Sequence, residues 1–324
     1  MRVEWGENTE MFEILCANPR CFQQSLQTLQ DFISVETFLQ AVLAMIMLSV
    51  GLSLTTKDFK YIVQNPRITI IGLFLKMFCF PFIGVAIANL MGLSITFQLG
   101  LFILLICPGG TTSNLITYWF SGNIPLTIAL TTIASFISVV TIPILTNWAH
   151  RFYFGDSVLV ELPVFHTVAN IFIVMIMPVL LGLFMRWRYE QQSIVAEKIL
   201  KYVSVVLLAV VYLIKFFASK ENGGTEISRE EFLTLLPVLL VINLSALVFG
   251  FLASKLLQIK TQDSMTIGIE VGLENVSLAI VVGSVLLQNE DLVKPGLIYA
   301  MFSFWTVMGF AILVKKLFFK KNWN

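Results

Sequence analysis

The sequence predicts an all-α polytopic membrane protein with about nine transmembrane helices. Of its 324 residues, 57% are hydrophobic and only 13% are charged, against about 25% charged residues in a typical soluble domain. Long apolar segments recur at the ~20 residues that a helix needs to cross a bilayer. Helices are expected because backbone groups inside lipid must be hydrogen-bonded within their own segment. The ten-residue alternating pattern of a β-barrel is not seen.

Nine apolar spans follow a polar N-terminal segment, residues 1–33. This segment carries four glutamates and no long apolar run, so it does not resemble a signal peptide. Residues 318–324 are expected to form a basic tail. The sequence predicts kinks at Pro81, Pro143 and Pro178. The expected spans are residues 35–54, 66–90, 95–120, 123–148, 164–185, 199–217, 232–255, 264–287 and 296–317.

Charges in the loops predict the orientation. One side of the membrane receives 13 Lys and Arg residues and the other side seven, so the positive-inside rule places the C-terminus in the cytoplasm and the N-terminus outside. The net charge of +1 gives no reason to expect a nucleic-acid partner. His150 and His166 are not at metal-ligand spacing. Whether Cys16 and Cys21 form a disulfide is left open.

Two spans contain residues that an uninterrupted membrane helix rarely accommodates. Residues 107–114 read CPGGTTSN, and residues 268–277 read GIEVGLENVS. Proline removes a backbone donor and glycine lowers helix propensity, while a charge at the bilayer centre costs at least ~2.5–3.5 kcal/mol. Such stretches persist at depth only where protein encloses them or they line a cavity. Paired interruptions in the two halves of a chain are typical of inverted-repeat transporters.

These two motifs resemble the crossover motifs of the bile acid:sodium symporter family, and more closely those of its prokaryotic members than those of the animal bile acid carriers. The resemblance covers most of the chain from about residue 35, including residues 51–54 and 66–81. It implies a transporter with two broken, crossing helices in the bacterial inner membrane. Its core domain would comprise residues 66–148 and 232–317, broken near 108–114 and 270–277. The panel domain would comprise residues 35–54, 164–185 and 199–217, with substrate bound between the domains and transport by alternating access.

The resemblance implies a first sodium site that this sequence retains. Every member of the site carries an oxygen, as a hard cation requires. Two of them are threonines at i and i+4, so that both hydroxyls can share one helix face. No organic cofactor is expected. The ligands would be Ser113, Asn114, Thr127, Thr131 and Glu270.

The second sodium site of the family is altered here. Lys76 stands where the family has a glutamine in the second span, and Glu274 stands where it has a glutamine before the motif asparagine. The other contacts would be Glu270, Val271 and Leu273. We expect the Lys76 ammonium to replace the second sodium ion and to pair with Glu274 or Glu270. Alternatively, Lys76 reaches a local carbonyl or a water-filled crevice. One sodium ion rather than two then suffices, and because a buried lysine can also lose its proton, proton coupling stays open.

Members of the family carry organic anions such as bile salts, sulfated steroids and small carboxylates. Free backbone donors and the positive ends of half-helices favour a carboxylate. A sodium-independent or proton-coupled carrier or exchanger of the same fold, a passive channel and a sensor are the rival interpretations. A membrane enzyme is disfavoured because no hydrolase, Walker or zinc motif is present. Substrate identity and oligomeric state are left open. The expected substrate contacts are Thr111, Thr112, Asn275, Ser277 and Thr306.

Overall fold

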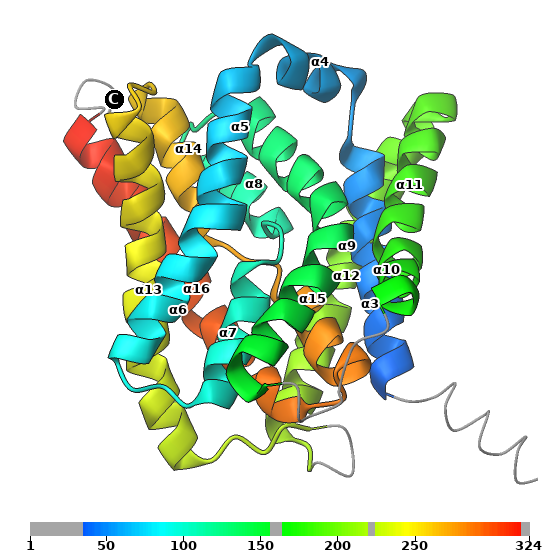
Figure 1. The fold of residues 1–324 in the computed structure, drawn as a ribbon. Helices are drawn as coiled ribbons and strands as arrows, with labels where there is room; N and C mark the ends of the chain where they lie inside the picture. The colour runs from blue at the N-terminus through cyan, green and yellow to red at the C-terminus, as the bar shows by residue number, and fades with distance from the viewer. Residues whose placement is uncertain (1–34, 156–163, 220–223, 319–324) are drawn as a thin grey trace, which may run out of the picture.

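The computed structural model describes residues 35–155, 164–219 and 224–318, and over these residues its regular secondary structure is helical (Figure 1). Residues 1–33, with Cys16 and Cys21, and residues 319–324 lie outside the described part. The helices are α3 (Val35–Ser53), α4 (Thr56–Gln64), α5 (Pro66–Phe74), η1 (Leu75–Cys79), α6 (Phe80–Leu90), α7 (Ile95–Leu105), α8 (Thr111–Trp119), α9 (Ile124–Phe154), α10 (Val164–Ile171), η2 (Phe172–Ile176), α11 (Met177–Arg188), α12 (Glu190–Phe217), α13 (Arg229–Leu256), α14 (Thr261–Gly272), α15 (Val276–Val281), η4 (Val282–Leu286), η5 (Glu290–Leu292) and α16 (Lys294–Phe318).

Six helical segments of the described chain are long and apolar enough to cross a membrane, and three shorter apolar helices accompany them. The chain is therefore an integral membrane protein. Several helices extend beyond the expected spans, and two extend furthest, since α9 continues to Phe154 and α12 begins at Glu190. Apolar composition marks only the part of a helix inside hydrocarbon, whereas the helix itself continues into the polar interface. The six segments are Pro66–Leu90, Ile124–Phe154, Val168–Arg188, Glu190–Phe217, Arg229–Leu256 and Glu290–Phe318.

Both interrupted spans are broken helices in the structure. The helix pair α7 and α8 is separated by the Pro-Gly-Gly stretch, and the pair α14 and α15 by residues 273–275. The two breaks cross each other, because Gly109 and Glu274 form an antiparallel bridge and the Asn275 N–H donates to the Pro108 carbonyl at 2.9 Å. Figure 1 shows this crossing near the middle of the helix bundle. Backbone groups freed by the breaks thus partly satisfy each other.

Two of the three expected proline kinks coincide with π-helical turns. Pro81 follows η1 and Pro178 follows η2. A proline cannot donate to the carbonyl four residues earlier and its ring crowds that carbonyl. In both places the residue before the proline donates instead to the carbonyl five residues earlier, from Phe80 to Leu75 and from Met177 to Phe172. Pro143 lies inside α9, which continues as an α-helix.

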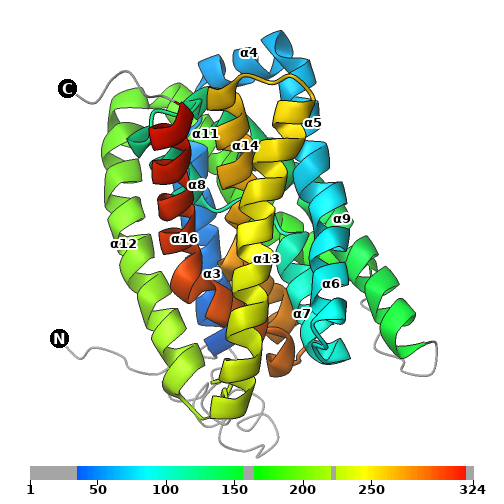
Figure 2. The same cartoon turned by 90° about the vertical axis from the view of Figure 1, so that its left-hand side faces the viewer.

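The helices pack into two groups. One group consists of α3 packed against α11 and α12, and the other includes α13 packed against α14 and α16. Figure 2 shows α12 on the side of the bundle opposite α6 and α9. The groups meet where α3 contacts α15 and where α12 contacts α16. Of the second broken helix, α14 packs against α13 and α16 of the second group, and α15 contacts α3 of the first.

Candidate ion and substrate site

Five oxygen-bearing side chains meet beside the crossing, from α8, α9 and α14. The Thr127 hydroxyl donates to Glu270 Oε2 at 2.9 Å, and the Thr131 hydroxyl donates to Glu270 Oε1 at 2.7 Å. Asn114 Oδ1 lies 3.1 Å from the Thr127 hydroxyl, and Ser113 Oγ lies 3.5 Å from it. Glu270 is 1% exposed. The structure thus brings together all five residues that the resemblance assigns to the first sodium site.

This cluster has the chemistry of an alkali-cation site. A hydroxyl both donates and accepts, so each threonine can bond to the carboxylate and still present a lone pair to a cation. The negative charge of an ionised Glu270 is costly at this depth unless a cation compensates it. Gly109 makes room for this carboxylate, because a methyl group built at Gly109 would overlap Glu270 Oε1. The donor set therefore fits Na⁺.

Lys76 occupies a second position beside the same crossing. Its Nζ lies 2.8 Å from Glu274 Oε2 and donates to the Glu270 carbonyl at 2.7 Å and the Leu273 carbonyl at 3.4 Å. The side chains of both Lys76 and Glu274 are 1% exposed. Glu274 and Glu270 are the two partners that the sequence predicts for Lys76. Glu274 forms the ion pair, whereas Glu270 accepts a hydrogen bond through its backbone oxygen.

Local structure explains why Lys76 reaches this position. Lys76 lies in the π-helical turn η1, and such turns often redirect side chains at functional sites. Its ammonium meets the last carbonyls of α14, where the helix dipole favours a cation. These carbonyls and the Glu274 carboxylate are oxygen donors that Na⁺ would also use. Val271 turns its side chain toward Gly250 of α13.

The expected substrate contacts fall in two places. Thr111 begins α8, Thr112 follows it with an exposed side chain, and Ser277 is buried in the first turn of α15. Asn275 caps α15, because its Oδ1 accepts a hydrogen bond from the Leu278 N–H at 3.1 Å. These residues lie at the N-termini of the two half-helices. Thr306 lies elsewhere, on α16.

Thr306 belongs to a buried network behind the end of α14. Its hydroxyl contacts Asn243 Oδ1 of α13. The Asn243 amide donates to the Gly272 carbonyl at 2.8 Å, and the Tyr299 hydroxyl donates to the same carbonyl at 2.9 Å. Asn243 and Tyr299 are fully buried, and sequence reasoning missed both. An amide in the middle of an apolar span was the available signal for Asn243.

Comparison with known proteins decides the family. The model of the Sodium Bile acid symporter family matches residues 40–225, which is more than half of the chain. The chain belongs to this family. The "Uncharacterized sodium-dependent transporter YocS" of Bacillus subtilis is 28% identical over 252 residues, covering 76% of this chain and 74% of YocS. The human "Sodium-dependent organic anion transporter" is 25% identical, covering 87% of this chain and 73% of that protein.

One plant relative is longer than this chain. The "Probable sodium/metabolite cotransporter BASS1, chloroplastic" of Arabidopsis thaliana is 28% identical over 246 residues, and the match spans 75% of this chain but 58% of BASS1. The family and these relatives are transporters, so the chain is not an enzyme.

Proposed function

We propose that this chain is a sodium-coupled secondary transporter of small organic anions that binds one Na⁺ per cycle. The observation that carries the proposal is the balance of charge at the crossing. Glu270 and Glu274 contribute two negative charges, and Lys76 contributes one fixed positive charge at 2.8 Å from Glu274. One negative charge, on Glu270, is left for a mobile cation. The hydroxyls of Thr127 and Thr131 already converge on that carboxylate.

We further propose that Lys76 acts as a tethered substitute for the second sodium ion of the family. Its ammonium makes three contacts with oxygens, all at the end of α14. Removing one member of a buried ion pair leaves an uncompensated charge and typically costs ~3–5 kcal/mol. The pair therefore stays closed through the cycle, and only the Glu270 position exchanges its cation with solvent.

Alternating access would occur between the two helix groups, with nine spans in total. The panel would contain α3 and α10 to α12, and the core would contain the remaining spans. The spans would be related to one another as inverted repeats. Between the groups, residues of α3, α10, η2, α15 and η4 line a cavity of only about 10 Å³. A cavity of this size holds about one water molecule. The groups would have to separate here before an organic anion could bind.

An ion pair between described residues joins the proposed panel to the proposed core. Lys215, near the end of α12, lies 2.7 Å from Glu290 of η5, and its side chain is 1% exposed. Ser284 also donates to Glu290, at 3.2 Å. The loop charges predict that this end of α12 lies outside the cytoplasm. We propose that this pair closes the external side of the crevice and breaks when the transporter opens outward.

The substrate would be an anion bound by the N-termini of α8 and α15. Thr111 and Thr112 begin one half-helix, and Asn275 and Ser277 begin the other. The first N–H groups of a helix lack partners within it and carry partial positive charge. Because the Thr306 hydroxyl bonds to Asn243, we assign Thr306 a supporting role rather than a substrate contact. Asn243 and Tyr299 hold the end of α14 through the Gly272 carbonyl.

A proton-coupled carrier of the same fold is the second candidate, and the Lys76–Glu274 pair is the observation that favours it. Lys76, Glu274 and Glu270 are all buried beside the crossing. In this candidate the driving ion would be H⁺, and a carboxylate at the crossing would carry a proton in place of Na⁺. The sodium-coupled interpretation is preferred because the hydroxyls around Glu270 form a coordination shell that a proton does not need.

The test is uptake of labelled taurocholate, pyruvate and pantoate into proteoliposomes under an inward Na⁺ gradient, with choline as the control and with an imposed pH gradient as a second arm. We expect Na⁺ to drive uptake of at least one anion, with a Hill coefficient for Na⁺ near one. Uptake driven by the pH gradient in the absence of Na⁺ would favour the proton-coupled candidate. A Hill coefficient near two would contradict the proposed role of Lys76.

A further inference from the structure

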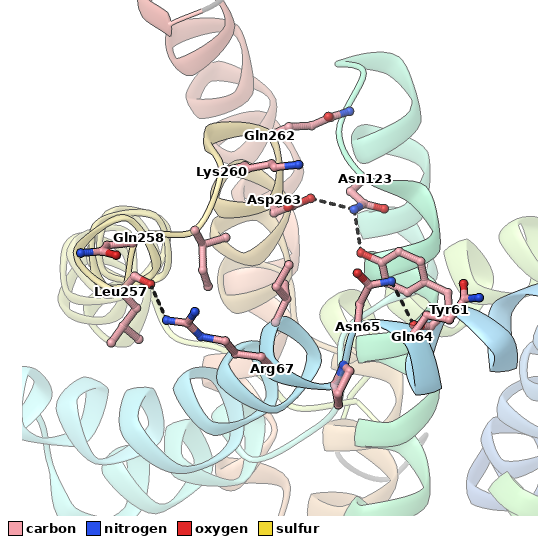
Figure 3. Close-up of a pocket in the computed structure, with 13 residues that line it drawn as sticks. Tyr61, Gln64, Asn65, Arg67, Asn123, Leu257, Gln258, Lys260, Gln262 and Asp263 are labelled. Carbon is pink, nitrogen blue, oxygen red and sulfur yellow. Dashed lines mark hydrogen bonds between the residues drawn. The ribbon is translucent and has the colours of Figure 1, made fainter.

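A polar pocket of about 490 Å³ opens where α4, α5 and the first turn of α14 meet (Figure 3). Asp263 lies at its inner wall and is 6% exposed. Asn123 donates to Asp263 Oδ1 at 2.7 Å and to the Tyr61 hydroxyl at 2.8 Å. Burial raises the pKa of the Tyr61 phenol above 10.0, and the charge of Asp263 also raises it. The inner wall therefore carries the single negative charge of Asp263.

A line of oxygens connects this pocket with the sodium cluster along α14. Asp263, Thr266 and Glu270 are spaced i, i+3 and i+7, which places them on one helix face. Seven residues of helix span about 10 Å. Thr266 is fully buried between the two carboxylates, and its Oγ1 accepts a hydrogen bond from the Asn123 N–H at 2.9 Å. Three oxygen-bearing residues thus lie along α14 between the pocket and the site, next to Ile267 on the same face.

A matching line of hydroxyls runs along α8. Ser113 and Thr117 are spaced i and i+4, and Ser113 belongs to the sodium cluster. The turn between α8 and α9 brings Thr117 close to Thr266. A methyl group built at Gly122 would lie 2.7 Å from the Thr117 methyl and 2.8 Å from the Thr266 hydroxyl oxygen. Thr117 and Thr266 therefore flank Gly122 midway between the pocket and Glu270.

Thr117 carries an unexplained polar atom. The residue is fully buried, and its hydroxyl oxygen has no hydrogen-bond partner among the described residues. Buried polar side chains nearly always have a partner, so an exception calls for a physical reason. A valine would fill nearly the same volume without the unpaired hydroxyl. Other buried hydroxyls, including that of Thr146, also lack a partner among the described residues. Thr117 differs from Thr146 because it lies one helical turn from Ser113 of the sodium cluster, where a passing ligand would supply such a reason.

We infer that Asp263, Thr266 and Thr117 form a cation path by which the sodium site exchanges its ion with the pocket on the expected cytoplasmic side. This inference rests on the proposed function. Along this path a partly dehydrated alkali cation would meet successive oxygens, and a side chain larger than that of Gly122 would crowd Thr117 and Thr266. The pocket also contains two exposed cations, Arg67 and Lys260. Their charge weakens cation retention in the pocket, which suits a place where the ion is released.

The test measures ²²Na⁺ exchange of the full chain in proteoliposomes, together with Na⁺-dependent thermal stabilisation of the purified protein. Thr117→Val is the central variant, because it removes a hydroxyl that has no protein partner and should leave folding intact. Asp263→Asn is the second variant. We expect both to slow exchange about tenfold, the factor that ~1.4 kcal/mol of barrier produces. The Na⁺ concentration for half-maximal stabilisation should stay unchanged, because the binding site is intact.

Thr146→Val is the matched control. Thr146 is also fully buried with no partner for its hydroxyl among the described residues, but it lies far along α9 from the cluster. Its exchange rate should equal that of the wild type. Wild-type exchange rates in Thr117→Val and Asp263→Asn, or equal slowing in Thr146→Val, would overturn the path and leave the sodium site standing. A wild-type protein without any Na⁺-dependent stabilisation or exchange would overturn both.

Discussion

At the scale of single residues, the crossing is an arrangement of three buried charges. Lys76 and Glu274 are paired at 2.8 Å, and Glu270 is bound by two hydroxyls. Charges this deep are tolerated only when each has a partner. Substitutions that alter the charge balance should therefore have larger effects than substitutions that only alter shape.

Lys76→Gln alone should destabilise the protein by ~3–5 kcal/mol, because Glu274 is then buried without its cation. The double variant Lys76→Gln/Glu274→Gln should recover most of this loss. It should also respond more steeply to Na⁺, since a second cation position becomes free. Thermal melts in NaCl and in choline chloride measure both effects. If the double variant keeps the wild-type sodium dependence, Lys76 does not stand in for an ion.

Thr131→Val should weaken Na⁺ binding, because it removes a hydroxyl that contacts Glu270 at 2.7 Å. A net loss of ~0.5–1.5 kcal/mol is expected for one such contact, or up to about tenfold in affinity. The Na⁺ concentration for half-maximal thermal stabilisation is the measurement. The same exchange at Thr146, on the same helix, should have no effect on it. Unchanged sodium affinity in Thr131→Val would remove this hydroxyl from the site.

At the scale of elements, two broken helices hold the site by crossing. Their breaks pair through Gly109 with Glu274 and through Pro108 with Asn275. The close approach depends on glycine, since Gly109 lies directly against the Glu270 carboxylate. The geometry of the site is thus determined by backbone contacts between segments that are distant in sequence.

Gly109→Ala should abolish the response to Na⁺, because the new methyl group would displace Glu270 from the hydroxyls of Thr127 and Thr131. Gly309→Ala is the matched control, since a methyl group there meets no atom within 4 Å. Alanine has the higher helix propensity, so this control should be neutral or slightly stabilised. Both are compared by thermal melts across a range of NaCl concentrations. A sodium response in Gly109→Ala equal to wild type would show that the carboxylate is not confined.

Lys215→Met should favour the outward-open state, because it removes the contact between α12 and η5. The readout is the rate at which a membrane-impermeant thiol reagent labels a cysteine introduced at Leu286, with the native cysteines replaced. Lys294→Met breaks a similar pair with Glu231, at 2.6 Å, inside the proposed core. Labelling should accelerate in the first variant only. Equal rates in both variants would argue against a closure at this position.

At the scale of the whole molecule, the sequence predicts the helical membrane architecture and both breaks. It does so because hydrocarbon excludes unpaired backbone groups and unpaired charges, so apolar length and misplaced polar residues are strong signals. The contact of Lys76 with Glu274 follows from the same demand for a counter-charge. Side-chain directions on a helix depend instead on tertiary neighbours. Sequence reasoning therefore missed the turn of Thr306 toward Asn243 and the cluster of Tyr61, Asn123 and Asp263.

The fixed charge of Lys76 has an electrical consequence. A carrier that moves one Na⁺ with one monovalent anion transfers no net charge, so the membrane potential does no work on it. Such a carrier does not gain the ~2.3 kcal/mol per charge that a potential of 100 mV would supply. The sodium gradient alone then limits how far the anion is concentrated. The steady-state ratio of internal to external monoanion should therefore be the same under valinomycin-imposed potassium potentials of either sign. A higher ratio with a negative interior would reveal a second cation and contradict this stoichiometry.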